Sequence, residues 1–287
     1  MDPPLGPPRV TICLLTFGDY SRLARQALDS IKRCCSRDTY KLVVGSNAVC
    51  EETASLLRRR QEAGDIDRLI MSSTNLSKCP MMRRMFAEID TEYIWWFDDD
   101  SYVTEPGALT RWLHAADASS SSTVIWGALA WCGHESSFAD MNDVFEFVRS
   151  ASWYRGLPLP SWRVGGKGEF DFRGLGVGDG RWLFILGGCF LIRTTAVRAL
   201  DWPDRRLLRT GDDVFLGEAI RQQGWEQCDV GPLGVALNTE PRRGSQAPAS
   251  SPSAENPTKV VELATPTQSA WPAVVKWSGG NSLPGQT

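Results

Sequence analysis

The sequence predicts an α/β fold in which a central, mostly parallel sheet is flanked by helices. Strand-like and helical segments alternate along the first hundred residues, which is the order expected of a parallel sheet with crossover helices. The run RVTICLLTF (9–17) is largely apolar, a composition typical of a strand covered on both faces. A chain of 287 residues with 42% hydrophobic content can bury one large core, so we expect a single Rossmann-like domain with extensions.

The first half of the expected domain spans residues 9–103 and follows a proline-rich lead at 1–8. Apolar residues at helical spacing, such as Leu23, Ala27 and Ile31, indicate its first helix, and Pro80 suits the first turn of its third helix. We expect strands at 9–17, 40–48, 67–73 and 92–100, with helices at 21–35, 51–64 and 80–90.

The second half, residues 104–243, has a different composition. After a helix at 105–117, residues 124–183 are rich in Trp, Gly and Pro, which indicates mixed strands and long loops around a site. Gly187 and Gly188 interrupt a strand and predict either a bulge or the close approach of a ligand. We expect the remaining elements as a strand at 183–193, helices at 194–202 and 211–225, strands within 228–237, and a Ser- and Pro-rich linker and tail at 244–287.

Composition and charge argue against several classes of protein. The net charge of −3 gives no basic field, so nucleic-acid binding is not expected. No apolar run reaches the roughly 20 residues of a membrane-spanning helix, and the N-terminus lacks the basic and apolar parts of a signal peptide. We therefore expect a cytoplasmic protein, for which peripheral membrane contact stays open. The eight cysteines lack a metal-binding spacing, which favours reduced structural thiols.

Three consecutive aspartates follow the apolar run YIWWF, at the expected carboxyl end of a strand. If the strand persists, Asp98 and Asp100 project to one face and Asp99 to the other. No Lys or Arg lies within several residues, so a divalent metal, Mg²⁺ or Mn²⁺, is the natural countercharge for these carboxylates. An exposed acidic turn or a cap for the next helix is the alternative interpretation.

A second acidic pair, Asp212 and Asp213, precedes a helix with an apolar face. A helix cap needs only one of the two, and capping is the alternative interpretation for Asp212. The other is held near a helix N-terminus, stays ionised at neutral pH and is suited to accept a proton from a hydroxyl nucleophile.

The order of these motifs resembles that of the family-two glycosyltransferases, which have the glycosyltransferase A-type fold. The resemblance rests on five segments in order: VTICLLTFGDYSRLARQALDSI, VVGSNA, YIWWFDDDSYV with its D-x-D motif, GGCFLIR and GDDVFLGEAIRQQGW. It implies the transfer of a sugar, with inversion, from a nucleotide-diphosphate donor, favoured as a UDP-sugar, to an acceptor hydroxyl. Residues 9–103 would then bind the nucleotide, and residues 104–243 would bind the acceptor and carry out catalysis.

The resemblance also implies roles for individual residues. Asp98 would face the nucleotide sugar, Asp100 would bind the metal with Asp98 beside it, and Asp213 would be the catalytic base with Asp212 as its acidic neighbour. Further donor contacts would come from Thr16 and Phe17 near the base, Asn47 where the family often has an acidic residue, Asp99, Gly187 and Gly188. Candidates for the phosphates are Lys78, Arg83 and Arg84, for which solvated helix faces are the alternative. Relatives place a histidine metal ligand or an arginine for phosphate in the later segment NTEPRRG, where Glu240, Arg242 and Arg243 would be the substitutes.

Aromatic residues between the motifs are candidates for stacking on an acceptor sugar, and core packing is the alternative for each of them. These residues are Trp126, Trp131, Trp153 and Trp162. Three other functions stay open: a fringe-like β1,3-type glycosyltransferase, a phosphatase of the haloacid dehalogenase type, and a non-catalytic carbohydrate-binding protein, the last suggested by the twelve tryptophans.

Overall fold

The computed structural model describes residues 6–132, 141–159, 182–208, 212–231 and 233–237. Several residues singled out in the sequence lie outside these ranges. They are Trp162, Glu240, Arg242, Arg243 and the expected tail at 244–287.

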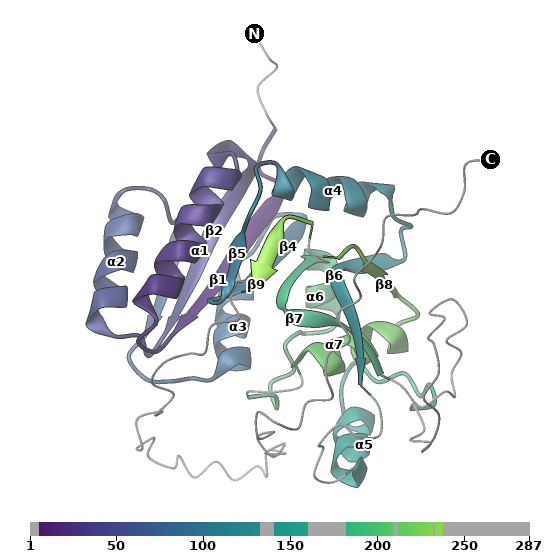
Figure 1. Cartoon of the computed structure of the whole chain (residues 1–287). Coiled ribbons are helices and arrows are strands. Elements are labelled where there is room, and N and C mark those ends of the chain that lie inside the picture. The colour runs from purple at the N-terminus through teal and green to yellow at the C-terminus, as the bar shows by residue number, and fades with distance from the viewer. Residues whose placement is uncertain (1–5, 133–140, 160–181, 209–211, 232, 238–287) are drawn as a thin grey trace, which may run out of the picture.

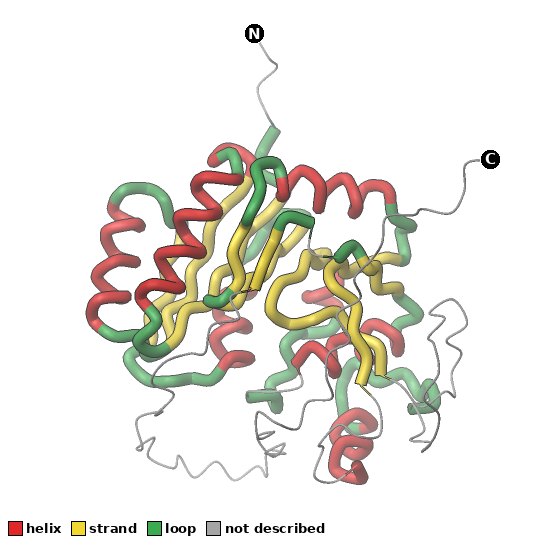
Figure 2. Tube along the Cα trace, viewed as in Figure 1, coloured by secondary structure: helices red, strands yellow, loops and turns green. Residues whose placement is uncertain are grey.

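A sheet of seven strands forms the centre of the molecule, in the order β3-β2-β1-β4-β7-β6-β8 (Figures 1 and 2). Its strands are β1 (Val10–Phe17), β2 (Tyr40–Asn47), β3 (Arg68–Ser72), β4 (Tyr93–Asp98), β6 (Thr123–Cys132), β7 (Trp182–Arg193) and β8 (Glu226–Asp229). Only β7 runs antiparallel to its two neighbours, β4 and β6, and the other neighbouring strands are parallel. The predicted α/β fold with a mostly parallel sheet is therefore confirmed.

Helices cover both faces of this sheet (Figure 1). One buried cluster joins the sheet to α1 (Ser21–Cys34), α2 (Glu51–Glu62) and α4 (Ala108–Ala118). The other joins it to α3 (Lys78–Phe86), α5 (Met141–Arg149), α6 (Thr194–Ala199) and α7 (Asp212–Gln222). A short 3₁₀ helix, η1 (Arg37–Thr39), precedes β2.

Strand β4 shows how the two cores are built from one sequence pattern. Its side chains alternate between the faces, because successive residues of a strand point to opposite sides. Trp95 packs against Trp112 of α4, with ring centroids 5.6 Å apart, whereas Trp96 packs edge-on against Phe86 of α3 at 5.7 Å. The apolar run YIWWF is therefore buried on both sides, as expected for a central strand.

The second half differs from expectation in two elements. Helix α5 lies within the region expected to hold strands and long loops, because the nine residues MNDVFEFVR form a short amphipathic helix there. The expected closing strand region separates into β8, at the edge of the main sheet, and β9 (Val235–Leu237), which pairs with β5 (Ser101–Val103) in a small second sheet.

The glycine pair of β7 lies in a bulge, as the sequence predicted. Pairing between β6 and β7 shifts between Gly127, which lies opposite Phe190, and Leu129, which lies opposite Ile185. Gly187 and Gly188 therefore fall within the extra residues of the β7 strand.

Two further expectations concern membranes and thiols. None of the helices in the described ranges has the length and apolar character needed to cross a bilayer. The described cysteines are free thiols, and four of them are buried: Cys13, Cys34, Cys35 and Cys79.

Candidate active site

The aspartates of the D-x-D motif lie at the carboxyl edge of the parallel strands. Asp98 is the last residue of β4 and lies opposite Leu15 near the end of β1. At the same edge, Phe17 of β1 lies opposite Asn47 of β2. Ligands of open α/β sheets bind at this edge, so the strands place the motif where a substrate site is expected.

The backbone turns within the motif, which corrects one expectation. Strand β4 ends at Asp98, and Asp99 and Asp100 form the turn that leads into β5. The alternation of an extended strand therefore does not set their directions. Asp99 is buried, whereas Asp98 and Asp100 are half-buried.

Lys78 supplies a countercharge that proximity in the sequence did not reveal. It is the first residue of α3, and its Nζ lies 3.1 Å from Asp98 Oδ2 and 3.1 Å from Asp212 Oδ2. The same Nζ donates to the carbonyl oxygen of Gly187 at 3.2 Å. Because the side chain of Lys78 is only 19% exposed, its ion pairs are largely shielded from water. No basic residue is near the aspartates in the sequence, but Lys78 meets them in the fold, so the alternative of a solvated Lys78 was wrong.

Asp213 is held by backbone groups on the other side of Lys78. Its Oδ2 accepts a hydrogen bond from the Gly187 N–H at 3.2 Å, and its Oδ1 accepts one from the Val214 N–H at 2.9 Å. A Cβ atom on Gly187 would lie 3.3 Å from Asp213 and from Lys78 Nζ. Side chains of the protein itself therefore approach Gly187 closely, and the close approach of a ligand to the glycine pair stays a prediction.

Burial and mutual repulsion shift the pKa values of carboxylates in this cluster. Burial raises the pKa of Asp98 to about 6, and the nearby charge of Lys78 opposes this rise. Burial also raises the pKa of Asp213 to about 6, with a further contribution from the charge of Asp212. Burial alone would lower the pKa of Lys78, but the charges of Asp212, Asp98 and Asp213 outweigh it and raise this pKa above its usual value. Carboxyl groups that titrate near neutral pH in a cluster of this kind are typical of functional sites.

The carboxylates fit a divalent cation only in an open arrangement. In the described part of the chain no group of three or more His, Cys, Asp or Glu side chains is placed to hold a metal ion. Both oxygens of Asp98 already accept hydrogen bonds, Oδ1 from the indole N–H of Trp96 and Oδ2 from Lys78. Mg²⁺ and Mn²⁺ often use one carboxylate together with substrate phosphates, and Asp100 has the chemistry for such a site.

The residues expected near a nucleotide base are more buried than a contact requires. Thr16 is 1% exposed, and its hydroxyl donates to the carbonyl oxygen of Gly45. Asn47 is 2% exposed and is hydrogen-bonded within the protein. Phe17 is half-buried and offers more surface at this edge of the sheet.

Other candidates lie away from the cluster. Arg83 binds the carbonyl oxygen and the carboxylate of Asp201, and Arg84 is exposed about 9 Å further along the axis of α3 than Lys78. Trp126 and Trp153 are 0% and 1% exposed, so both belong to the core, as their alternative interpretation held. The side chain of Trp131 lies outside the described part.

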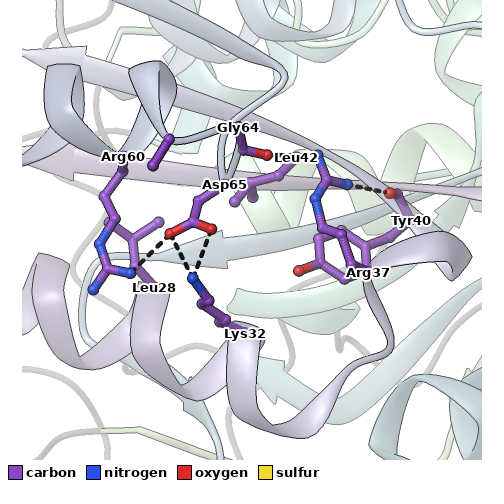
Figure 3. A pocket seen from close by; sticks show the side chains of 9 residues that line it. Leu28, Lys32, Arg37, Tyr40, Leu42, Arg60, Gly64 and Asp65 are labelled. Carbon is purple, nitrogen blue, oxygen red and sulfur yellow. Dashed lines mark hydrogen bonds and ion pairs between the residues drawn. The ribbon is translucent and has the colours of Figure 1, made fainter.

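A cavity of about 230 Å³ lies at the opposite, amino edge of the sheet, beside the first residues of β2 (Figure 3). Its cations are already paired: Lys32 and Arg60 both bind Asp65, and Arg37 donates to the carbonyl oxygen of Tyr40. These contacts hold the ends of α1 and α2 to the strand edge and are remote from the aspartate cluster.

One feature marks Lys78 as unusual once the start of α3 is known. A lysine at the first residue of a helix is disfavoured by the helix dipole, and α3 has no acidic residue in its first turn to compensate. A charge placed against this preference indicates a partner elsewhere in the fold. The partners themselves, Asp98 and Asp212, become visible only with the tertiary structure.

Comparisons with known proteins concern the family and the fold of the chain. A family model described as "Glycosyltransferase like family 2" matches residues 7–242. The chain is similar in fold to the mannosyltransferase PcManGT from Pyrobaculum calidifontis, solved in complex with GDP-Man and Mn²⁺, with a TM-score of 0.54 and 17% identity. That match covers 84% of this chain and 59% of PcManGT, so the chain spans less than two thirds of that protein.

A weaker likeness relates the chain to TarS of S. aureus. The crystal structure of its residues 1–349 in complex with UDP gives a TM-score of 0.48 at 12% identity, covering 75% of this chain and 55% of the 1–349 chain. No curated protein sequence gives a significant match.

Proposed function

Because the chain belongs to the glycosyltransferase-like family 2, we propose that it is a metal-dependent, inverting glycosyltransferase. The resemblance and the glycosyltransferase A-type fold expected from the sequence are both confirmed. The observation that carries the proposal is the convergence of Asp98, Asp212 and the Gly187 backbone on Lys78. This convergence joins the motif of the first half of the chain to the acidic pair of the second half.

The donor in this proposal is a nucleoside diphosphate sugar. Asp100 holds a divalent cation, which when bound neutralises charge on the diphosphate leaving group. Asp98, with Asp99 behind it, faces the nucleotide sugar, and Lys78, which pairs with Asp98, is a cation of the described residues that meets the diphosphate. PcManGT was solved with GDP-Man, whereas the sequence favoured a UDP-sugar, so both bases enter the experiment below.

Asp213 is the general base in this proposal. The acceptor oxygen forms a bond to the anomeric carbon while the bond to the diphosphate breaks, and the diphosphate leaves with the electron pair. The acceptor proton moves to the Asp213 carboxylate, which the Gly187 and Val214 N–H groups hold in place. A single displacement of this kind inverts the anomeric configuration.

Thermal unfolding with UDP, GDP and their sugars, with and without Mn²⁺, tests the proposal. A nucleotide at about 100 times its Kd stabilises by about 2.7 kcal/mol, which raises the Tm of a domain of this size by roughly 5–10 °C. Asp100→Ala should lose the Mn²⁺-dependent part of this shift. The exposed Asp90→Ala, which removes only a surface pair with Lys41, should keep it.

Nucleotide binding, phosphate release and sugar binding together separate the other functions considered from the sequence. Phosphate release from a simple ester, with no response to nucleotides, would support a phosphatase. Sugar binding that ignores both Mn²⁺ and Asp213→Asn would support a non-catalytic binding protein. A fringe-like transferase shares the proposed mechanism and would differ in its acceptor.

A further inference from the structure

Asn47, the last residue of β2, uses both of its amide hydrogens within the protein. Its Nδ2 donates to Asn75 Oδ1 at 3.0 Å and to the carbonyl oxygen of Ser77 at 3.2 Å. Its Oδ1 accepts from the backbone N–H of Leu76 at 2.8 Å. The side chain is therefore bonded to three successive residues that lead into α3, and at 2% exposure it presents almost no surface to a ligand.

The turn held by Asn47 contains an unusual backbone conformation. Ser77, the residue before α3, has φ 70° and ψ 169°, a combination that costs free energy for any residue with a Cβ atom. Asn75 Oδ1 accepts from the Ser77 N–H at 2.8 Å as well as from Asn47. The side chains of Asn75 and Asn47 thus form hydrogen bonds to the N–H and the C=O of Ser77, respectively.

This turn fixes the backbone position from which the Lys78 side chain extends, because Lys78 follows Ser77 directly and is the first residue of α3. From there its Nζ reaches Asp98 and Asp212, each at 3.1 Å. If Ser77 relaxed to a common conformation, the start of α3 would move and both ion pairs would lengthen. The geometry therefore connects Asn47 to the centre of the candidate site through two residues.

We propose that Asn47 is a positioning residue that acts on the diphosphate through Ser77 and Lys78, and that it does not read the nucleotide base. This inference rests on the proposed function, because Lys78 meets a diphosphate only in a nucleotide-sugar enzyme. It assigns to Asn47 an effect that is independent of the base. Recognition of the base belongs to other residues at this edge of the sheet.

Binding of three probes in the presence of Mn²⁺ tests the inference: UDP, GDP and inorganic pyrophosphate, the last of which has no base. Asn47→Ala should weaken all three by the same factor, about tenfold for the displacement of one charge-assisted contact. Asn75→Ala removes the oxygen that accepts from both Asn47 and Ser77, at an exposed residue, and should give the same pattern. Loss of UDP or GDP affinity with unchanged pyrophosphate affinity would overturn the inference, as would unchanged affinity for all three.

A second-site change distinguishes positioning from general damage. Glycine adopts the conformation of Ser77 without strain, so Ser77→Gly in the Asn47→Ala background should restore most of the lost affinity. The matched amide change Gln61→Ala on the exposed surface of α2 should bind as the unmodified protein does, and Ser77→Gly alone is the reference against which the double variant is compared. Absence of any rescue would contradict the proposed route through Ser77.

Chemical labelling of Lys78 tests the positioning step without any nucleotide. In the full chain, acylation of the Lys78 amine, followed by mass spectrometry, should be several-fold faster in Asn47→Ala and slow again after Ser77→Gly is added. If no probe binds to the unmodified protein, the proposed function fails while this labelling still decides the positioning role. If Asn47→Ala leaves the labelling rate unchanged, the positioning role itself is wrong.

Discussion

Replacement of Lys78 by Met tests the electrostatics of the candidate site most directly. The substitution keeps a long apolar side chain but removes the charge that pairs with Asp98 and Asp212. It leaves these two carboxylates and Asp213 close together, with no cation from the described ranges of the chain between them. We expect Lys78→Met to lower the free energy of unfolding at neutral pH.

The magnitude follows from the burial of the pairs. Removing one partner of a buried ion pair typically costs about 3–5 kcal/mol, because the remaining charge is left uncompensated. The side chains of Lys78, Asp98 and Asp212 are 19%, 24% and 9% exposed, so water offsets part of this cost. We expect a loss of about 3 kcal/mol at pH 7.5, which lowers the Tm of a domain of this size by roughly 6–12 °C.

The loss should shrink as the pH falls. In the folded protein the pKa of Asp98 and that of Asp213 already lie near 6, above the usual 3.8, and removal of Lys78 raises both further. A folded state that binds protons more tightly than the unfolded state gains stability as the pH falls through the folded pKa. At pH 5 both carboxyl groups are largely protonated, so the expected loss is about half of that at pH 7.5.

Differential scanning calorimetry at pH 7.5 and pH 5.0 measures both effects. Lys32→Met is the matched control, because Lys32 pairs with Asp65 on the surface with its side chain 61% exposed. That control should change the free energy of unfolding by less than about 1 kcal/mol at either pH. A Lys78→Met protein as stable as the control, or one with the same loss at both pH values, would refute the reasoning.

Three further predictions concern catalysis. Asp213→Asn should lower kcat by about 10²–10⁴-fold while nucleotide binding is kept, because an amide does not take up the acceptor proton. The amide keeps only one of the two oxygens that accept the Gly187 and Val214 N–H groups, so Tm should fall, less so because a charge that burial disfavours is removed. Unchanged kcat would contradict the assignment of the base. With Asp213 intact, kcat/KM should fall as the pH drops below about 6, because the base becomes protonated, and a flat profile from pH 5 to 8 would argue against it. Gly187→Ala should reduce transfer at least tenfold with little change in Tm, because the new Cβ lies 3.3 Å from both Asp213 and Lys78 Nζ. Gly6→Ala, which meets nothing within 4 Å, is its control, and equal activity of the two variants would show that the contact at Gly187 is unimportant.

Local composition was sufficient to predict most of the sheet. The strand at 93–98 follows from the apolar run YIWWF, and its position before three acids predicted a site at the carboxyl edge. The bulge of β7 followed from its glycine pair for the same reason, because glycine tolerance is a local property. Helix α5 was missed because nine residues carry a weak periodic signal within a Trp- and Gly-rich region.

The charge balance of the site depends on contacts between distant parts of the chain. Lys78 precedes Asp98 by 20 positions and meets Asp212 from the other half of the chain. No pattern in either segment specifies that they meet, because the meeting depends on the start of α3 and the start of α7 facing the same strand edge. The burial of Asn47 and Thr16 is equally a property of the packed structure.

The pairing of β4 with β7 has a consequence for how the chain is made. Trp95 lies opposite Leu191, so one edge of the buried strand finds its partner only after the ribosome has added roughly a hundred further residues. At about 5–20 residues per second this delay lasts on the order of 5–20 s. During that time one edge of this apolar strand is unpaired in the nascent chain, and an unpaired edge can associate with other chains. Newly made protein should therefore depend on chaperones most strongly between the synthesis of β4 and that of β7.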